Sequence, residues 1–184
     1  MSALACCACA AVVWALARQQ VPAAYGFQVV RTFPHDAGAY TQGLVYHEGT
    51  LYEGTGKYGQ STLRQVDLET GKILQLHSLE DRLFGEGIAI WDEKILQLTW
   101  KSRVGVVYDR KTLRETARFR YSGQGWGLTH DGTQLIMSDG TSTLRFLDPQ
   151  TYQVVRQLHV RDRGRRVDNL NELEYVHGEV LANI

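Results

Sequence analysis

A short pattern recurs four times along the chain, and it restricts the fold more than any other feature of the sequence. Its variable position holds a different polar or aromatic residue in each copy, with spacings of 44, 40 and 45 residues. The four copies are Tyr40-Thr41-Gln42-Gly43-Leu44, Phe84-Gly85-Glu86-Gly87-Ile88, Gly125-Trp126-Gly127-Leu128 and Leu170-Asn171-Glu172-Leu173. Repeats of this length are typical of propellers and solenoids. In such folds the scaffold stays constant, so we expect the chemistry at the positions that vary.

Each repeat is predicted to hold four short β-strands. An apolar run begins nine residues after each variable position, a later strand ends on an aspartate turn, and a fourth apolar stretch closes the unit. The aspartate turns are at Asp67, Asp109 and Asp148, and the closing stretches are 73–79, 115–121 and 154–160. Four strands in about 40 residues, without a helical period, indicate one propeller blade. A β-sandwich with chance similarity is the alternative, and the repeated register favours the propeller.

We therefore expect an all-β partial propeller over residues 25–184, with blades at about 40–80, 84–121 and 123–160 and part of a fourth at 168–184. Residues 25–36 resemble the end of the third blade, which predicts a closing strand lent to the last blade. Such a strand would remove an open sheet edge. About three and a half blades cannot close a ring. The sequence is thus interpreted as C-terminally truncated, a fragment of a longer protein or a broken gene product.

Residues 1–24 have the character of a secretory leader. Ala3 to Ala17 carry no charge, a run too short to span a bilayer, and Ala15-Leu16-Ala17 resembles a cleavage site. A second cleavage option is Pro22-Ala23-Ala24, and a positively charged start is missing. The leader predicts a secreted, periplasmic or cell-envelope protein with no transmembrane span. All three cysteines lie within it, which excludes disulfides and cysteine metal sites from the mature chain.

The charge balance of 20 basic and 20 acidic residues favours no nucleic acid partner. The basic stretch 161–166 is interpreted as a solvated loop between blades rather than a phosphate site. His47, His130 and His177 fall at predicted hairpin turns, where we expect them to be exposed, and their spacing suits no zinc motif.

The first strand of each propeller blade lines the central channel, so Gln42, Glu86, Trp126 and Asn171 are expected to converge there. Fourteen residues after the variable position, Trp100 replaces a residue that is glycine in two sister blades, which favours a pocket. Trp91, by contrast, is expected to pack between blades.

Glu86 lies between two glycines, and a carboxyl enclosed by indoles would have its pKa raised by desolvation. It could then act as a general acid and base. The alternative is a glutamate paired with a basic neighbour inside the ring.

These segments, together with Leu98-Thr99-Trp100 and Asn169-Leu170-Asn171-Glu172-Leu173-Glu174, resemble the glutamine cyclotransferase family, the plant and bacterial type of glutaminyl cyclase. The resemblance runs from about Tyr25 to Ile184. It implies a five-bladed propeller that converts the N-terminal glutamine of peptides or proteins to pyroglutamate and releases ammonia. By the same resemblance Glu86 is the catalytic acid and base, and Gln42, Trp100, Trp126 and Asn171 bind the substrate.

The resemblance also implies that no cofactor is required, that a divalent metal ion in the channel would be structural, and that the full-length protein is a monomer. A further channel tryptophan and a lysine of that family would lie beyond Ile184. The competing hypotheses are a non-catalytic propeller that binds peptides or a cell-envelope partner, and an inactive fragment. A channel-metal hydrolase would need several carboxylates and a histidine, which the equivalent positions do not supply.

Overall fold

A computed structural model of the chain describes residues 26–184. The expected leader, its cleavage sites and the three cysteines lie outside the described residues. Between Gly26 and Ile184 the regular structure is all β. No helix in this part of the chain is long and apolar enough to cross a membrane.

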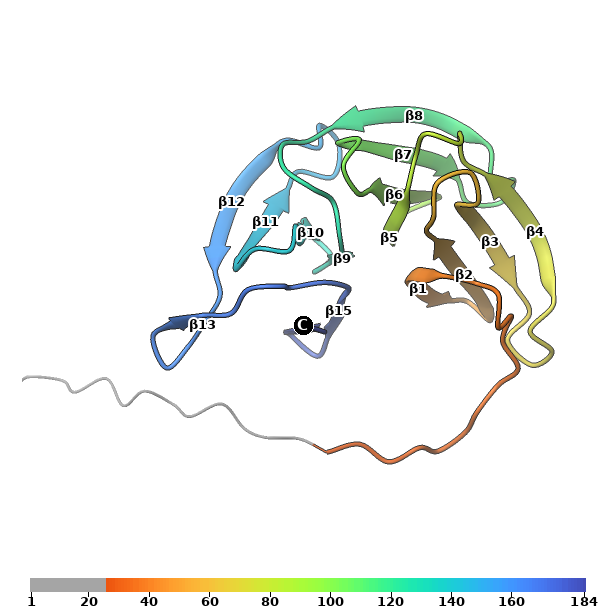
Figure 1. The fold of residues 1–184 in the computed structure, drawn as a ribbon, viewed down its shortest axis with the longest axis horizontal. Coiled ribbons are helices and arrows are strands. Elements are labelled where there is room, and N and C mark those ends of the chain that lie inside the picture. Colours follow the sequence, from red (N-terminus) through yellow and green to blue (C-terminus); the bar gives the residue numbers. More distant parts are fainter. Residues whose placement is uncertain (1–25) are drawn as a thin grey trace, which may run out of the picture.

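Three four-stranded antiparallel sheets follow one another along an arc (Figure 1), each with its strands in chain order. The first contains β1 (Thr41–His47), β2 (Thr50–Thr55), β3 (Thr62–Val66) and β4 (Ile73–Ser78). The second contains β5 (Gly85–Trp91), β6 (Lys94–Thr99), β7 (Val104–Asp109) and β8 (Glu115–Arg120). The third contains β9 (Leu128–His130), β10 (Leu135–Met137), β11 (Thr143–Leu147) and β12 (Val154–His159).

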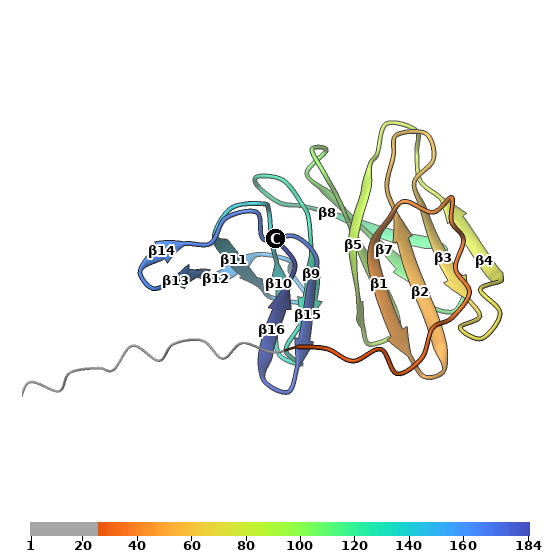
Figure 2. The same cartoon turned by 60° about the horizontal axis from the view of Figure 1, so that its bottom comes forward.

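A two-stranded sheet, β15 (Leu173–Val176) and β16 (Glu179–Ala182), continues the series. The first strands β1, β5, β9 and β15 run side by side on the inner side of the arc (Figure 2), and β4, β8 and β12 form its rim. This arrangement of four-stranded sheets resembles propeller blades. The expected all-β class and the four strands of each of the first three units are confirmed.

The turn between the third and fourth strands has the same construction in each four-stranded sheet. The Asp67 Oδ1 accepts hydrogen bonds from the Thr70 N–H at 2.8 Å and from its hydroxyl at 2.6 Å. The equivalent pairs, Asp109 with Thr112 and Asp148 with Thr151, make the same two bonds. An aspartate that binds the backbone ahead of it fixes a tight turn, which explains why the sequence repeats Asp and Thr at this spacing.

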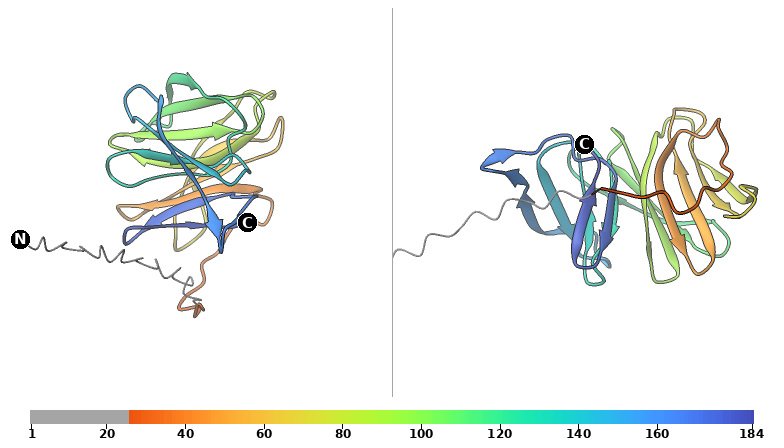
Figure 3. Two further views of the ribbon diagram at one scale, coloured as in Figure 1. Left: turned by 90° about the vertical axis from the view of Figure 1, so that its left-hand side faces the viewer. Right: turned by 90° about the horizontal axis from the view of Figure 1, so that it is seen from below.

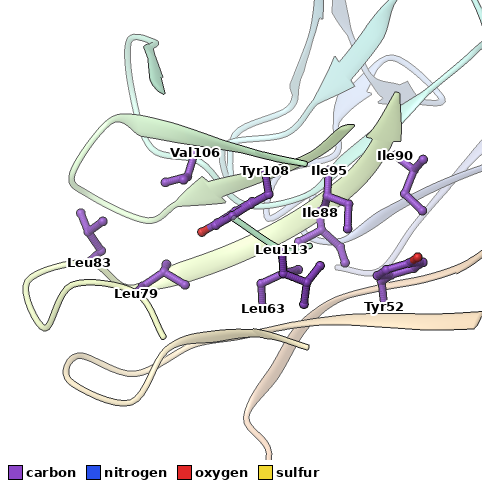
Figure 4. Packing of buried hydrophobic residues seen from close by; sticks show 10 residues of the cluster. All are labelled: Tyr52, Leu63, Leu79, Leu83, Ile88, Ile90, Ile95, Val106, Tyr108 and Leu113. Atoms are coloured by element: carbon purple, nitrogen blue, oxygen red, sulfur yellow. The ribbon is translucent and has the colours of Figure 1, made fainter. Parts of the chain in front are cut away.

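The apolar core lies between successive sheets. Leu63 of the first sheet packs with Ile88, Ile95 and Tyr108 of the second in one buried cluster (Figure 4). Comparable clusters join the second sheet to the third and the third to β15. Successive sheets therefore bury the faces that they turn toward each other, while the rim strand β12 is exposed along its whole length.

The N-terminal segment lies outside the regular sheets. Residues 26–36 form no strand, and the closing strand expected at 25–36 stays a prediction, because it was expected to pair with a last blade that the described residues do not include. They cross the open side of the arc (Figure 1, Figure 3) and are attached to the first sheet by an Asp36–Arg64 ion pair at 2.8 Å and by His35, 2.9 Å from the buried Glu53. A strand requires a partner to hydrogen-bond with, and within residues 26–184 none lies beside this segment.

Two expectations need correction. The basic stretch folds into a short exposed hairpin of β13 (Arg161–Asp162) and β14 (Arg165–Arg166) rather than a plain loop. His130 is half-buried, with its ring 5.3 Å from Trp91 of the second sheet, so it is not simply an exposed turn residue. Trp91 itself packs between the second and third sheets, as predicted.

Candidate active site

One cavity at the ends of the inner strands collects residues from all four units. Its volume is about 330 Å³. It is lined by Tyr40, Gln42, Phe84, Glu86, Trp100, Trp126 and Asn171. All five residues singled out in the sequence therefore share one cavity. The sequence analysis assigned no role to Tyr40 and Phe84, although both belong to the repeated segments.

Two of the polar residues owe their position to irregularities in strand pairing. Thr41 pairs with Thr55 and Gly43 with Gly54, so Gln42 is an extra residue in β1. In β5 the register shifts between Gly85 and Ile88, and Glu86 lies within this shift. β-Bulges often occur beside functional sites, because they redirect a side chain out of the regular alternation. The bulges place Gln42 and Glu86 at the cavity.

Two glycines give the aromatic walls their space. A Cβ atom at Gly56 would lie 2.4 Å from the Phe84 ring, and one at Gly140 would lie 2.7 Å from the Trp126 ring. Both distances are shorter than a carbon–carbon contact allows. These glycines occupy the sequence position that holds Trp100 in the second unit. At this equivalent position, the glycines of the first and third units leave space for a neighbouring ring, whereas Trp100 of the second unit provides a ring itself.

Backbone hydrogen bonds between successive units hold the tryptophans in place. The Gly87 N–H donates to the Trp126 carbonyl at 2.8 Å, and the Gly125 N–H donates to the Trp100 carbonyl at 3.0 Å. The fully buried Ser138 adds a link to the fourth unit, because its hydroxyl donates to the Asn171 carbonyl at 2.7 Å. The cavity is thus assembled from segments that are rigidly connected at its base.

Three of the four aromatic rings that line the cavity contact one another through Phe84. Phe84 lies edge-on to Trp100, with ring centroids 5.6 Å apart, and edge-on to Tyr40 at 6.2 Å. Such edge-to-face contacts stabilise a fixed arrangement of rings. The wall is apolar, and the polar groups that share the cavity are Glu86 and the two amides of Gln42 and Asn171.

Glu86 is the strongly perturbed carboxyl of this cavity. Its side chain is buried, with 6% of the residue exposed. Burial raises its pKa from 4.5 to about 8, and no charged neighbour contributes to the change. The direction is the one expected from the sequence. The alternative of an internal ion pair with a basic residue has no support among the described residues. A carboxyl that titrates near neutrality can both accept and donate a proton.

A second buried carboxyl, that of Glu172, lies beside Gly87 and does not line the cavity, and nothing in the sequence pointed to a role for it. A Cβ atom at Gly87 would lie 2.7 Å from its Oε2, so the two residues are in contact. Burial, then the charges of Glu174 and Glu86, raise the pKa of Glu172 to about 9, and the nearby Leu44 N–H, outside hydrogen-bonding geometry, opposes the rise. Neither oxygen has a hydrogen-bond partner in the described part of the chain.

Across residues 26–184, no three His, Cys, Asp or Glu side chains are grouped so as to hold a metal ion.

The sequence profile described as glutamine cyclotransferase matches residues 1–184 of the chain. The chain belongs to the glutamine cyclotransferase family. A curated relative of this chain is the glutaminyl-peptide cyclotransferase of Arabidopsis thaliana, which is 46% identical over 159 residues. That match covers 85% of this chain and 50% of the Arabidopsis protein.

Solved structures agree with the family assignment. The chain is similar to the crystal structure of Myxococcus xanthus glutaminyl cyclase, with a TM-score of 0.79 and 37% identity. This match covers 85% of the present chain and 66% of the Myxococcus chain. The Neurospora crassa Pan2 WD40 domain gives a TM-score of 0.58 at 11% identity, which shows a likeness of fold alone. The chain thus spans between half and two thirds of the length of the cyclotransferase relatives described here.

Proposed function

We propose that this protein is a glutaminyl-peptide cyclotransferase. It would convert the N-terminal glutamine of a peptide or protein to pyroglutamate and release ammonia. The observation that carries the proposal is the buried Glu86, with its raised pKa, beside two amide side chains in an aromatic cavity. Membership of the glutamine cyclotransferase family supports the assignment.

The proposed reaction joins two groups of one residue. The neutral α-amine of the substrate attacks the carbon of its own side-chain amide, and a carbon–nitrogen bond forms to close a five-membered lactam. Glu86 takes a proton from the attacking nitrogen and gives a proton to the departing amide nitrogen. The second carbon–nitrogen bond then breaks, and ammonia leaves. Because the nucleophile is tethered to its target, the protein need only select the folded-back conformer.

The pKa of Glu86 suits this exchange. Its value of about 8 is close to that of a peptide α-amine, which is about 7.7–8.0. A proton can therefore pass between the two groups with little change in free energy. A carboxyl with its ordinary pKa would be almost fully ionised at neutral pH. It would then seldom hold the proton that the departing ammonia needs.

The remaining residues would hold and cover the substrate. Gln42 and Asn171 carry both donors and acceptors on their amides, so they would hold the substrate amide oxygen and the α-amine. Trp100 and Trp126 would enclose the glutamine side chain and exclude water. The two indoles come from successive units, so together they would cover two sides of a glutamine side chain in the cavity.

No redox cofactor is needed, because no electrons are transferred in the proposed reaction. A structural divalent cation in the channel would need several oxygen ligands. Glu172 offers two oxygens without partners, but the described carboxylates and histidines do not form a complete site. None of the proposed steps runs through a metal ion.

We further propose that, in a protein of its relatives' length, these sheets form part of a five-bladed ring that is a monomer. The similarity to the longer Myxococcus cyclase supports this architecture. The uncharged run from Ala3 to Ala17 supports secretion or a place in the cell envelope.

The function is tested by incubating a glutamine-initiated peptide with the protein and following the loss of one ammonia by mass spectrometry. The same peptide with an acetylated α-amine is the control, because its nitrogen is no longer a nucleophile. The expected result is loss of ammonia from the free peptide alone. Binding of the peptide without turnover would support the non-catalytic propeller, and neither binding nor turnover would indicate an inactive fragment.

A further inference from the structure

Gln124 lies between the two tryptophans of the cavity but does not line it. Its side-chain Oε1 accepts a hydrogen bond from the Trp100 Nε1–H at 2.5 Å and another from the Trp126 Nε1–H at 3.0 Å. Trp100 follows β6 in the second unit, and Trp126 precedes β9 in the third. One amide oxygen therefore joins indoles from two different units.

The chemistry of the groups fixes which end of the amide faces the indoles. An indole nitrogen can only donate a hydrogen bond, so the atom that meets two of them must be the oxygen. A carbonyl oxygen has two lone pairs and can accept both. Gln124 thus satisfies the polar atom of each ring, and neither N–H is free to bond the Glu86 carboxyl or a substrate oxygen in the same cavity.

The loop that carries Gln124 is anchored next to Trp100. The Gly125 N–H donates to the Trp100 carbonyl at 3.0 Å. On the other side of Gln124, the buried Tyr121 hydroxyl accepts from the Thr99 N–H at 2.9 Å and donates to its carbonyl at 2.5 Å. These bonds hold the amide in place relative to both rings.

We propose that Gln124 is a positioning residue for the cavity, which orients the indoles of Trp100 and Trp126 by accepting both of their N–H groups. The inference rests on the cyclotransferase function for its kinetic consequence but not for its structural one. With the N–H groups directed at Gln124, the rings present apolar carbon surface to the substrate. Without an acceptor, each ring can rotate toward another partner, and the shape of the cavity is no longer unique.

Three substitutions separate the effect of losing the hydrogen-bond acceptor from the effect of changing the size of the side chain. Gln124→Met keeps the length of the side chain but has only a weak acceptor. Gln124→Glu keeps two good acceptor oxygens. Gln150→Met makes the same chemical change at an exposed turn far from the cavity and is the matched control.

The structural readout is the indole N–H signals in the NMR spectrum of the chain labelled with ¹⁵N-tryptophan. Phe substitutions of Trp100 and Trp126 assign the two signals, and Trp91 serves as an internal reference for folding. In Gln124→Met we expect the Trp100 and Trp126 signals to move upfield and their hydrogen exchange to accelerate, with Trp91 unchanged. In Gln124→Glu and Gln150→Met both signals should keep their protection.

The kinetic readout is turnover of a glutamine-initiated peptide. Loss of one net hydrogen bond predicts a fall of about tenfold in kcat/KM for Gln124→Met, chiefly through a higher KM. The KM of Gln124→Glu should be close to that of the unsubstituted chain. Unchanged indole signals in Gln124→Met, or signals that Gln124→Glu fails to restore, would overturn the proposal. Absence of turnover in the unsubstituted chain would instead count against the cyclotransferase function, because the indole signals do not depend on catalysis.

Discussion

Replacing Glu86 by glutamine should abolish catalysis and at the same time stabilise the fold in a pH-dependent manner. The folded state holds the pKa of Glu86 at about 8, compared with 4.5 in water. As the pH rises above 4.5, the unfolded chain releases this proton while the folded chain retains it. The free energy of unfolding therefore falls across this window and levels off once the pH passes about 8.

The size of the effect follows from the difference in pKa. Each pH unit within the window is worth about 1.4 kcal/mol. Between pH 4.5 and pH 7 the raised pKa of Glu86 therefore costs about 3 kcal/mol of stability. Glutamine does not ionise in either state, so Glu86→Gln lacks this loss. Relative to the unsubstituted chain, the free energy of unfolding of Glu86→Gln should therefore increase by about 1.4 kcal/mol for each pH unit within the window.

Urea denaturation of both proteins, followed by circular dichroism at several values between about pH 5 and pH 8, measures the difference. Glu179→Gln is the control, because that side chain is exposed in the folded state. The difference in the free energy of unfolding between Glu179→Gln and the unsubstituted chain should not change with pH. A constant difference between Glu86→Gln and the unsubstituted chain would refute the burial of an uncharged carboxyl at this position. Undiminished turnover in Glu86→Gln would refute its role as proton carrier.

Three other predictions test separate parts of the structure. Glu172→Gln should stabilise the fold with the same sign and a window that extends to about pH 9, because burial raises its pKa further; urea denaturation measures this. Gly56→Ala should displace the Phe84 ring, destabilise the fold by about 1–3 kcal/mol and raise KM, measured by denaturation and peptide turnover. Leu63→Ala, at a fully buried site, should lower the free energy of unfolding by about 2–5 kcal/mol. Leu74→Ala, at a site 60% exposed, should lower it by less than about 0.5 kcal/mol. Equal losses in urea denaturation would contradict the packing between sheets.

Local sequence signals predicted the elements that depend on local interactions. The Asp67 and Thr70 turn could be recognised because both partners lie within four residues. The convergence of Gln42, Glu86, Trp126 and Asn171 could be predicted because a repeat fixes equivalent positions in space. Pattern and register were therefore sufficient to find the cavity.

What the sequence could not predict depends on pairing between distant segments. The bulges at Gln42 and Glu86 are properties of two strands together, not of one. The strand expected at residues 25–36 stays a prediction for the same reason, since its formation requires a partner that is not among the described residues. Gln124 gave no signal because its role arises only when Trp100 and Trp126 are brought to the same side chain. Burial of Glu172 likewise depends on the space that Gly87 leaves in another unit.

The central position next to the variable residue is Gly43, Gly87 and Gly127 in three units and Glu172 in the fourth. A Cβ at Gly87 would meet the Glu172 carboxyl, and one at Gly127 would lie 2.8 Å from the Glu172 Cα. The units are therefore not interchangeable, even though they share one architecture. Duplicating the fourth unit in place of a neighbour would put two buried carboxyls where there is room for one. A copy of the second or third unit in its place would carry a glycine there, and the space that the Glu172 side chain fills would be empty. A fold of this kind that is built from copies of one unit must therefore change this residue in one copy and keep it small in the neighbouring copies.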